Sequence, residues 1–306
     1  AAHVLKYKYG MNPLTVTWPP ILYTKYGKRN FDKCNEVGGF DNITVTPNPK
    51  VLKILTKLAI LKLLHPFQTF KLGQKNLAPY LAQKLGIKLI FYGENEAEYG
   101  NPLVDNTKST RDKSYFTIKN LNKSYLAGVK IKELTSKYKL SLTDLKYYLP
   151  LSFDELKNNN TQIHYLGYYL KWDPQEAYYY CAENTGYKAR PQRSEGTYSK
   201  YISIDDKIDD LHHYTRYIKF GIGRASTDAS QEIRNNHISR EEGKLLVKRF
   251  DGEFPERYFK EIMNYLDINE ESFHQTCNKF RSPHIWRKIK GKWKLRHTVN
   301  QNGTDD

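Results

Sequence analysis

The chain has 306 residues, with 49 Lys and Arg against 33 Asp and Glu, and its formal net charge is +16. A chain of this length can bury about 75% of the surface that its unfolded form exposes, which allows one or two domains. Residues 51–64 are the most apolar stretch, and lysines interrupt it. The sequence therefore excludes a membrane-spanning helix, which needs about 18 or more apolar residues in a row, and we expect no membrane partner.

The three cysteines are Cys34, Cys181 and Cys277, which lie far apart and show no CxxC spacing. This usage is typical of reduced thiols and argues against a zinc site. Reduced thiols indicate a cytoplasmic protein, and no signal peptide or lipidation motif is visible.

The positive charge raises the alternative of a nucleic-acid partner, because lysines that face phosphates supply non-specific affinity. The lysines are scattered along the chain instead of forming one basic run. Such a surface also attracts anionic nucleotide sugars. Nucleic acid is therefore the less favoured partner.

The first hundred residues alternate between helix and strand patterns. Residues 1–9 indicate a helix that ends at Gly10, and strands are predicted at residues 14–18, 42–46 and 88–92. Asn48 and Pro49 mark the start of a helix that runs to residue 64, and a further helix is expected over 75–85. This alternation predicts an α/β fold with a doubly wound parallel sheet.

From residue 101 the pattern becomes helical and polar. Helices are predicted at residues 124–138, 142–148 and 206–220, and a further helix follows Ser226 and runs to Ile233. Another follows Ser239, which forms a capping box with Glu242. We therefore place a nucleotide-binding α/β domain at residues 1–102. Residues 103–306 are expected to form a mainly helical substrate-binding and C-terminal region.

The segment from Lys219 to Pro255 is dense in charge and is expected to carry two capped helices. The closely spaced charged residues are Arg224, Asp228, Glu232, Arg234, Arg240 and Glu241. Such a cluster either binds a charged ligand or forms a structural network of ion pairs. The glycines at 221 and 223 favour a sharp turn that brings Arg224 close to a ligand.

Several strings along the chain resemble one family. They are HPFQ at residues 65–68, FYGENEAEYGN at 91–101, GYYLKW at 167–172, GTYSKY at 196–201 and the block at 219–255. Together they resemble the N-acetyl sugar amidotransferases of bacterial lipopolysaccharide and nonulosonic-type sugar biosynthesis, in the PP-loop ATP pyrophosphatase superfamily. That resemblance implies a sheet of the adenine nucleotide alpha-hydrolase type.

The chain departs from this family in one respect, because the phosphate-binding pattern SGGxDS is absent. Residues 1–9 predict a helix whose start is missing before Ala1. In the family this helix follows directly on the phosphate loop. We therefore expect the chain to be a fragment that lacks the first strand and the loop.

The resemblance implies an ATP- and Mg²⁺-dependent reaction. ATP activates the acetamido oxygen of a nucleotide-linked N-acetyl sugar as an adenylate, and ammonia then displaces AMP to leave an acetamidino group. Ammonia comes from separate glutaminase and channel subunits of the histidine-biosynthesis type. An amide oxygen is a very poor leaving group until it is activated, so the site must stabilise phosphates and a developing tetrahedral centre.

Candidate site residues follow from position and from the resemblance. Ligands bind beyond the carboxyl ends of parallel strands, and Gly73 with Gln74 is expected just before a helix N-terminus, where backbone N–H groups favour an anion. The candidates for catalysis are Glu94, Glu96, Arg224 and Arg240, of which the two glutamates are also the magnesium candidates. The candidates for ATP binding are Thr17, Trp18, Gly73, Gln74, Gly93 and Lys219. The candidates for substrate binding are Tyr198, Lys200, Asp228 and Glu232.

Two alternatives stay open. Related PP-loop enzymes modify tRNA bases, and the basic surface suits such a substrate. A non-catalytic module that binds nucleic acid or protein is the other alternative, which the missing phosphate loop permits. An SGGxDS string upstream of Ala1 favours the enzyme.

Overall fold

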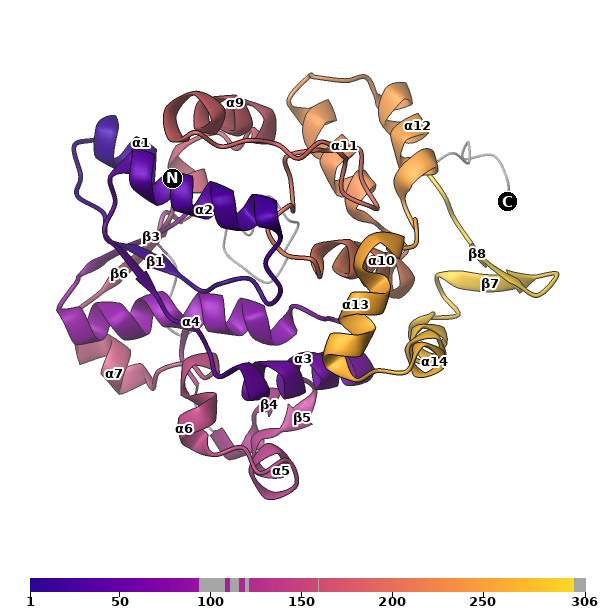
Figure 1. The fold of residues 1–306 in the computed structure, drawn as a ribbon, viewed down its shortest axis with the longest axis horizontal. Helices are drawn as coiled ribbons and strands as arrows, with labels where there is room; N and C mark the ends of the chain where they lie inside the picture. The colour runs from indigo at the N-terminus through magenta and orange to yellow at the C-terminus, as the bar shows by residue number, and fades with distance from the viewer. Residues whose placement is uncertain (94–107, 111–115, 119–120, 159, 300–306) are drawn as a thin grey trace. The chain divides into compact units, whose positions relative to one another are not determined.

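The computed structural model of the protein describes residues 1–93, 108–110, 116–118, 121–158 and 160–299 (Figure 1). The chain divides into two compact units. The first unit contains residues 1–20, 29–56 and 67–187, and the second contains residues 21–28, 57–66 and 188–306. The predicted domain boundary at residue 102 lies outside the described residues.

Parallel strand pairs form the sheets of the first unit. β1 (Thr15–Thr17) pairs with β2 (Asn42–Thr44), and β3 (Leu89–Tyr92) pairs with β6 (Gln162–Tyr165). The three predicted strands are thus present, and both pairs run parallel. Among the described residues the two pairs belong to separate sheets, so one doubly wound sheet stays a prediction.

Local sequence signals account for the first helices. α1 (Ala2–Tyr7) ends before Gly10, which takes a left-handed backbone conformation at φ +64°. α3 (Pro49–Leu63) begins where the sequence predicts, because the Asn48 side chain accepts a hydrogen bond of 3.0 Å from the Lys50 backbone N–H. The other helices of this part of the chain are α2 (Lys25–Gly38), α4 (Gln68–Leu85), η3 (Leu121–Lys123), α5 (Ile131–Ser136), α6 (Leu142–Leu145), η4 (Lys146–Tyr148), α7 (Phe153–Asn158), α8 (Leu166–Tyr169) and α9 (Pro174–Thr185).

The prediction of a helix at residues 124–138 is wrong for the first half of that range. The hairpin of β4 (Tyr125–Leu126) and β5 (Val129–Lys130) occupies that stretch, and only α5 is helical. Ala127 and Gly128 form the turn of this hairpin with φ values of +55° and +76°. A left-handed pair of residues cannot continue a right-handed helix, so the turn overrides the helical pattern.

The predicted start of α4 is also wrong. The helix begins at Gln68 instead of residue 75, so Gly73 and Gln74 lie inside it and not at its N-terminus. A Cβ atom on Gly73 would lie 2.4 Å from the buried indole of Trp18. Gly73 therefore serves close packing between helix and indole, and the physical reason for an anion site at this point is lost.

We expect Gly73→Ala to lower the free energy of unfolding by about 1 kcal/mol. Overpacking a core costs about 1–3 kcal/mol, which outweighs the roughly 1 kcal/mol that alanine gains over glycine within a helix. Chemical denaturation measures the change. Gln74→Ala, at the neighbouring exposed position, is the matched control and should change little. A Gly73→Ala protein more stable than the parent would contradict the packing role.

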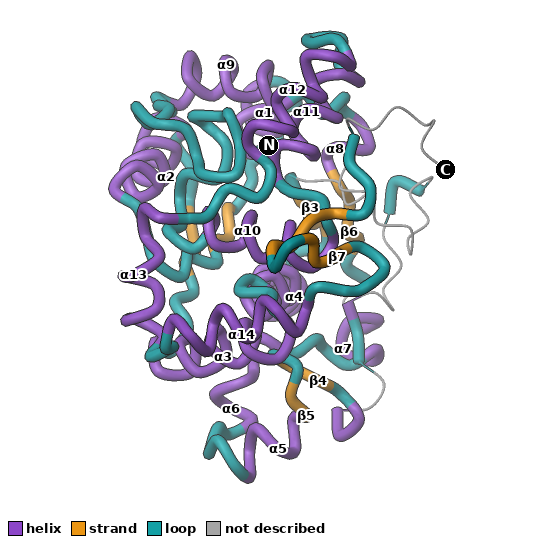
Figure 2. Tube along the Cα trace, turned by 90° about the vertical axis from the view of Figure 1, so that its right-hand side faces the viewer, coloured by secondary structure: helices purple, strands orange, loops and turns teal. Residues whose placement is uncertain are grey.

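The second unit is mainly helical (Figure 2). Its helices are α10 (Asp209–Phe220), α11 (Arg224–Arg234), α12 (Arg240–Phe250), α13 (Glu256–Leu266) and α14 (Glu270–Phe280), followed by the antiparallel hairpin of β7 (Trp286–Ile289) and β8 (Lys292–Leu295). The capping box is confirmed, since Ser239 N–H donates to the Glu242 carboxylate at 2.7 Å and Glu242 N–H donates to the Ser239 hydroxyl at 3.3 Å. Leu211, Ile262 and Phe273 are fully buried in its core.

Candidate functional site

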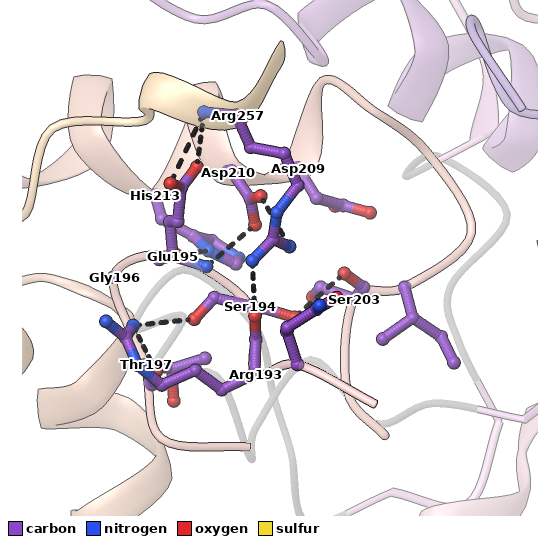
Figure 3. Close-up of polar contacts among 12 residues, drawn as sticks. Arg193, Ser194, Glu195, Gly196, Thr197, Ser203, Asp209, Asp210, His213 and Arg257 are labelled. Atoms are coloured by element: carbon purple, nitrogen blue, oxygen red, sulfur yellow. Dashed lines mark hydrogen bonds and ion pairs between the residues drawn. The ribbon is translucent and has the colours of Figure 1, made fainter. Parts of the chain in front are cut away.

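The loop of residues 190–204 is held by its own backbone and by Ser194. Ser194 N–H donates to the Ser199 carbonyl at 2.9 Å, and the buried Ser194 hydroxyl donates to the Ile202 carbonyl at 2.9 Å. Gly196, at φ +82°, allows the sharp turn between them. Figure 3 shows Ser194 with its neighbours Arg193, Glu195 and Thr197 in this loop. A loop fixed in this way can present side chains in one geometry.

Arg190 and Asp210 form a buried ion pair beneath this loop. Their side chains are each 3% exposed, and the guanidinium Nη2 lies 3.6 Å from the carboxylate Oδ1. Asp210 also accepts from the Glu195 backbone N–H at 3.1 Å, and Arg257 Nη1 lies 3.6 Å from its Oδ2. Burial raises the pKa of Asp210 to about 6 and lowers the pKa of Arg190, so for each group desolvation outweighs the partner's attraction.

Arg193 and Glu253 form a second, bidentate pair. Arg193 Nη1 and Nη2 donate to the two carboxylate oxygens at 2.6 and 2.5 Å, and the guanidinium lies over the Phe250 ring. Gly196 N–H donates to the same carboxylate at 2.7 Å. Burial opposes ionisation of Glu253, but the hydrogen bonds from Arg193 and Gly196 outweigh it and lower its pKa. Glu253 therefore ties the loop to the segment after α12.

His213 lies beneath the loop on α10. Its Nδ1 is 3.0 Å from the Glu195 carbonyl, and because a carbonyl only accepts, Nδ1 carries the proton. Burial, followed by the positive charge of Arg224, lowers the pKa of His213 to about 3. His213 is therefore a neutral imidazole near neutral pH.

One face of α11 gathers four of the residues that the sequence proposes for the site. Arg224, Asp228 and Glu232 are spaced four residues apart, so they lie along one stripe of the helix. Arg224 Nε donates to Asp228 at 2.8 Å, and Tyr198 donates its hydroxyl to Glu232 at 3.0 Å. Burial, and then the Glu232 carboxylate, raise the pKa of Tyr198. We call Tyr198, Arg224, Asp228 and Glu232 the α11 cluster.

The α11 cluster is joined to the loop by Thr197. The Thr197 hydroxyl donates to the second carboxylate oxygen of Asp228 at 2.5 Å, and Gly196 C=O accepts from Ala225 N–H at 3.0 Å. Asp228 is buried, with one oxygen on Arg224 and the other on Thr197. The sharp turn predicted before Arg224 is present, because Gly221 ends α10 at φ +70°.

The N-terminus of α11 is occupied by a side chain of the protein. Asp251 accepts from the backbone N–H groups of Gly223 and Ser226 at 2.9 and 3.1 Å and from the Ser226 hydroxyl at 2.5 Å. A Cβ on Gly223 would lie 2.4 Å from the Asp251 carboxylate. The end of this helix is thus filled by Asp251, and an external anion would have to displace it.

Three other candidates of the second unit make different contacts. Arg240 is the first residue of α12 and is exposed, and Lys200 is exposed while its carbonyl accepts from Arg190 N–H. Lys219 donates its amino group to the Leu63 carbonyl at 2.9 Å, and burial lowers its pKa. Lys219 therefore satisfies the last turn of α3. Among the described residues, none of the three side chains forms a hydrogen bond or ion pair with the α11 cluster.

The remaining candidates belong to the first unit. Thr17 accepts from the Asn42 amide at 2.9 Å, and Gly93 follows directly on β3. Trp18 is 5% exposed and meets Tyr148 edge to face, with ring centroids 5.2 Å apart. Glu94 and Glu96 lie outside the described residues.

Trp18 and Gly73 do not form the ATP site that the family resemblance implies. The Trp18 indole is closed in by Gly73 and Tyr148, and Gly73 N–H lies inside a helix where no phosphate could approach it. Within the described ranges, no group of three or more His, Cys, Asp or Glu side chains is arranged to hold a metal ion. ATP and Mg²⁺ therefore stay predictions.

Comparison with protein families finds a match in the second unit. Residues 195–300 match the model described as "LPS biosynthesis protein WbpG-like, C-terminal domain". This match supports a role in lipopolysaccharide biosynthesis, and it covers the α11 cluster, His213, Asp210 and Glu253. No curated protein matches the chain. In the part of the chain that the structure describes, no helix has the length and apolar character to cross a membrane.

Sequence reasoning missed the residues that hold the loop in place. They are Arg190, Arg193, Glu195, Asp210, His213, Glu253 and Arg257. The signal available was a short segment, residues 190–196, in which two arginines and a glutamate stand among Pro, Ser and Gly. Charged residues in a turn-forming segment indicate a loop whose charges have partners elsewhere, but the pattern does not name those partners.

Proposed function

We propose that the protein is an ATP-dependent amidotransferase that converts the acetamido group of a nucleotide-linked N-acetyl sugar into an acetamidino group during lipopolysaccharide biosynthesis. The observation that carries the proposal is the α11 cluster, which unites four residues chosen from the sequence. It lies within the segment that is similar to a lipopolysaccharide biosynthesis domain. The proposal includes a partner glutaminase with its channel subunit as the source of ammonia.

The cluster has the chemistry to bind a charged sugar. Carboxylates such as Asp228 and Glu232 accept hydrogen bonds from sugar hydroxyls, and the Tyr198 ring can pack against a sugar face. The Arg224 side chain is 18% exposed, and its guanidinium can donate two parallel hydrogen bonds to a phosphate or a carboxylate. A bound substrate would replace some of the partners that Arg224, Asp228 and Glu232 have within the cluster. These charged groups would therefore be paired both in the free protein and in the complex.

The buried pairs beneath the loop serve positioning in this proposal. Arg193 with Glu253 and Arg190 with Asp210 fix the loop that carries Thr197 and Tyr198. Side chains that are held by such contacts keep the geometry that binding needs. In the proposed reaction ATP would activate the amide oxygen, and Glu94 and Glu96 are the proposed magnesium ligands.

Arg224→Lys tests the proposal in the full-length protein. Lysine keeps the charge but loses the two parallel hydrogen bonds, so we expect turnover with ammonia and an N-acetylated nucleotide sugar to fall on the order of tenfold to a hundredfold. The thermal midpoint should change little, because lysine can still reach Asp228. Turnover is followed as AMP release.

Arg234→Lys is the matched control, because Arg234 stands on the same helix and donates to Gln231 at 2.6 Å. It should keep the parent's turnover. Unchanged turnover in Arg224→Lys would reject the ligand role, and parallel losses of turnover and midpoint would favour a structural network. Tight, salt-resistant binding of tRNA would favour the tRNA-modifying alternative.

A further inference from the structure

Positive charge is concentrated in the C-terminal hairpin, although the lysines of the chain as a whole are scattered. Seven Lys and Arg residues lie between Arg281 and Arg296, and no Asp or Glu occurs between Glu271 and Asp305. β7 and β8 form the hairpin, and Lys290 and Gly291 make its turn with φ values of +49° and +75° (Figure 1). The structure thus folds this segment back on itself and brings its lysines and arginines close together.

The two faces of the hairpin differ. Trp286, Trp293 and Leu295 share the face that packs on the unit, where Trp286 donates to the Ile218 carbonyl at 2.8 Å. Arg287 and Lys294 stand directly opposite each other on the other face, beside Lys292, and all three are exposed. Among the described residues these three make no ion pair. Like charges in direct opposition destabilise a hairpin, so the arrangement suits a surface that meets negative charge.

Exposed apolar side chains flank the base of the hairpin. Phe220 is 56% exposed and Ile222 is 51% exposed. They stand on either side of Gly221, where an added Cβ would lie 2.7 Å from Ile285 and 3.0 Å from Leu295. Phe220 and Ile222 therefore lie near the base of the hairpin. Lys288 is also exposed, on the same face as Trp293. We call these two apolar residues and the exposed cations of the hairpin the hairpin surface: Phe220, Ile222, Arg287, Lys288, Lys290, Lys292 and Lys294.

We propose that the hairpin surface binds the anionic face of a lipid bilayer. A cluster of four to eight lysines and arginines beside exposed apolar side chains is the composition that attracts proteins to anionic lipids. Such peripheral binding needs no membrane-spanning helix. The absence of an apolar span, on which the expectation of no membrane partner rested, therefore does not oppose it.

Two other polyanionic partners fit the surface less well. Single-stranded nucleic acid needs free aromatic faces for its bases, but Arg281 and Lys288 lie 5.6 and 5.0 Å from the Trp293 ring centroid and cover it. Protein interfaces are depleted in lysine, whereas four of the five cations of the hairpin surface are lysines. Lysine is suited to a diffuse anionic surface because it acts as a flexible point charge.

The test is co-sedimentation of the 306-residue chain with vesicles of phosphatidylcholine alone or mixed with phosphatidylglycerol. We expect binding to the mixed vesicles only, weakening as salt is raised. The triple variant Arg287→Gln, Lys292→Gln, Lys294→Gln should lose on the order of a hundredfold in partition coefficient, because each cation near an anionic surface is worth about fivefold. Ile222→Ser should lose several-fold, because an apolar side chain no longer enters the interface.

The matched control replaces Lys248, Arg249 and Lys260 with glutamine. These residues are also exposed, and the change in net charge is the same. The control should retain most of the binding. Equal losses in both triple variants would overturn the proposal in favour of net charge alone, and tighter binding to RNA than to mixed vesicles would overturn it in favour of nucleic acid. None of these readouts depends on enzyme activity, so the outcome is independent of the proposed function.

Discussion

Asp210→Ala is expected to lower the free energy of unfolding by about 3–5 kcal/mol. The replacement leaves the Arg190 guanidinium buried without its carboxylate, and removing one partner of a buried pair costs about this much. It also removes the acceptor of the Glu195 N–H. Chemical denaturation at neutral pH measures the loss.

Two further variants separate this mechanism from a general loss of packing. Arg190→Met combined with Asp210→Asn removes both charges and keeps an acceptor for Glu195, so it should cost less than Asp210→Ala alone. Glu36→Ala, which breaks the exposed pair of Lys33 and Glu36, should change stability little. A double variant as unstable as Asp210→Ala would show that the unpaired charge is not the cause.

His213 is expected to make the folded state sensitive to acid. Its pKa is about 3 in the folded state and 6.5 in the unfolded chain, so the unfolded state binds more protons between these values. Stability from this residue is complete above pH 6.5 and is lost as the pH falls towards 3. The loss is about 1.4 kcal/mol for each pH unit.

The measurement compares the slope of unfolding free energy against pH between pH 6 and pH 4 for the parent and for His213→Gln. Buried carboxyls act in the opposite direction, since burial raises the pKa of Asp206 to about 7 and that of Asp210 to about 6. They are present in both proteins, so the difference in slope isolates His213. His297→Gln, at an exposed residue beyond β8, is the control. Identical slopes for the parent and His213→Gln would contradict the assignment.

Local chemistry explains which elements the sequence predicts well. The capping box of Ser239 and Glu242 and the cap at Asn48 depend on residues within three positions of one another, and both are present. The start of α4 could not be predicted in this way. Gly73 reads as an interruption of the helix, but its partner is Trp18, which is distant in the sequence. Tertiary packing therefore decides what the glycine does.

The candidate site likewise combines features that local spacing determines with features that depend on distant contacts. Arg224, Asp228 and Glu232 could be placed on one stripe, because helical spacing alone determines it. That Tyr198 and Thr197 meet this stripe depends on contacts over more than thirty residues. The pairing of Arg193 with Glu253 spans sixty, and no local pattern encodes it. The magnesium candidates Glu94 and Glu96 lie outside the described residues, whereas Gly73 and Gln74 lie inside α4 and not at its start.

The position of Arg190 and Arg193 bears on where the C-terminal part of the protein can be cut. Similarity to a known domain begins at residue 195, just after both arginines. A polypeptide that started there would keep Asp210 and Glu253 but lose the guanidinium groups that neutralise them. The buried Asp210 would then keep only Arg257 as a charged partner, and Glu253 would lose both hydrogen bonds from a guanidinium group. We therefore expect a stably folded C-terminal fragment to begin upstream of Arg190, so that the boundary of sequence similarity need not be the boundary of a folding unit.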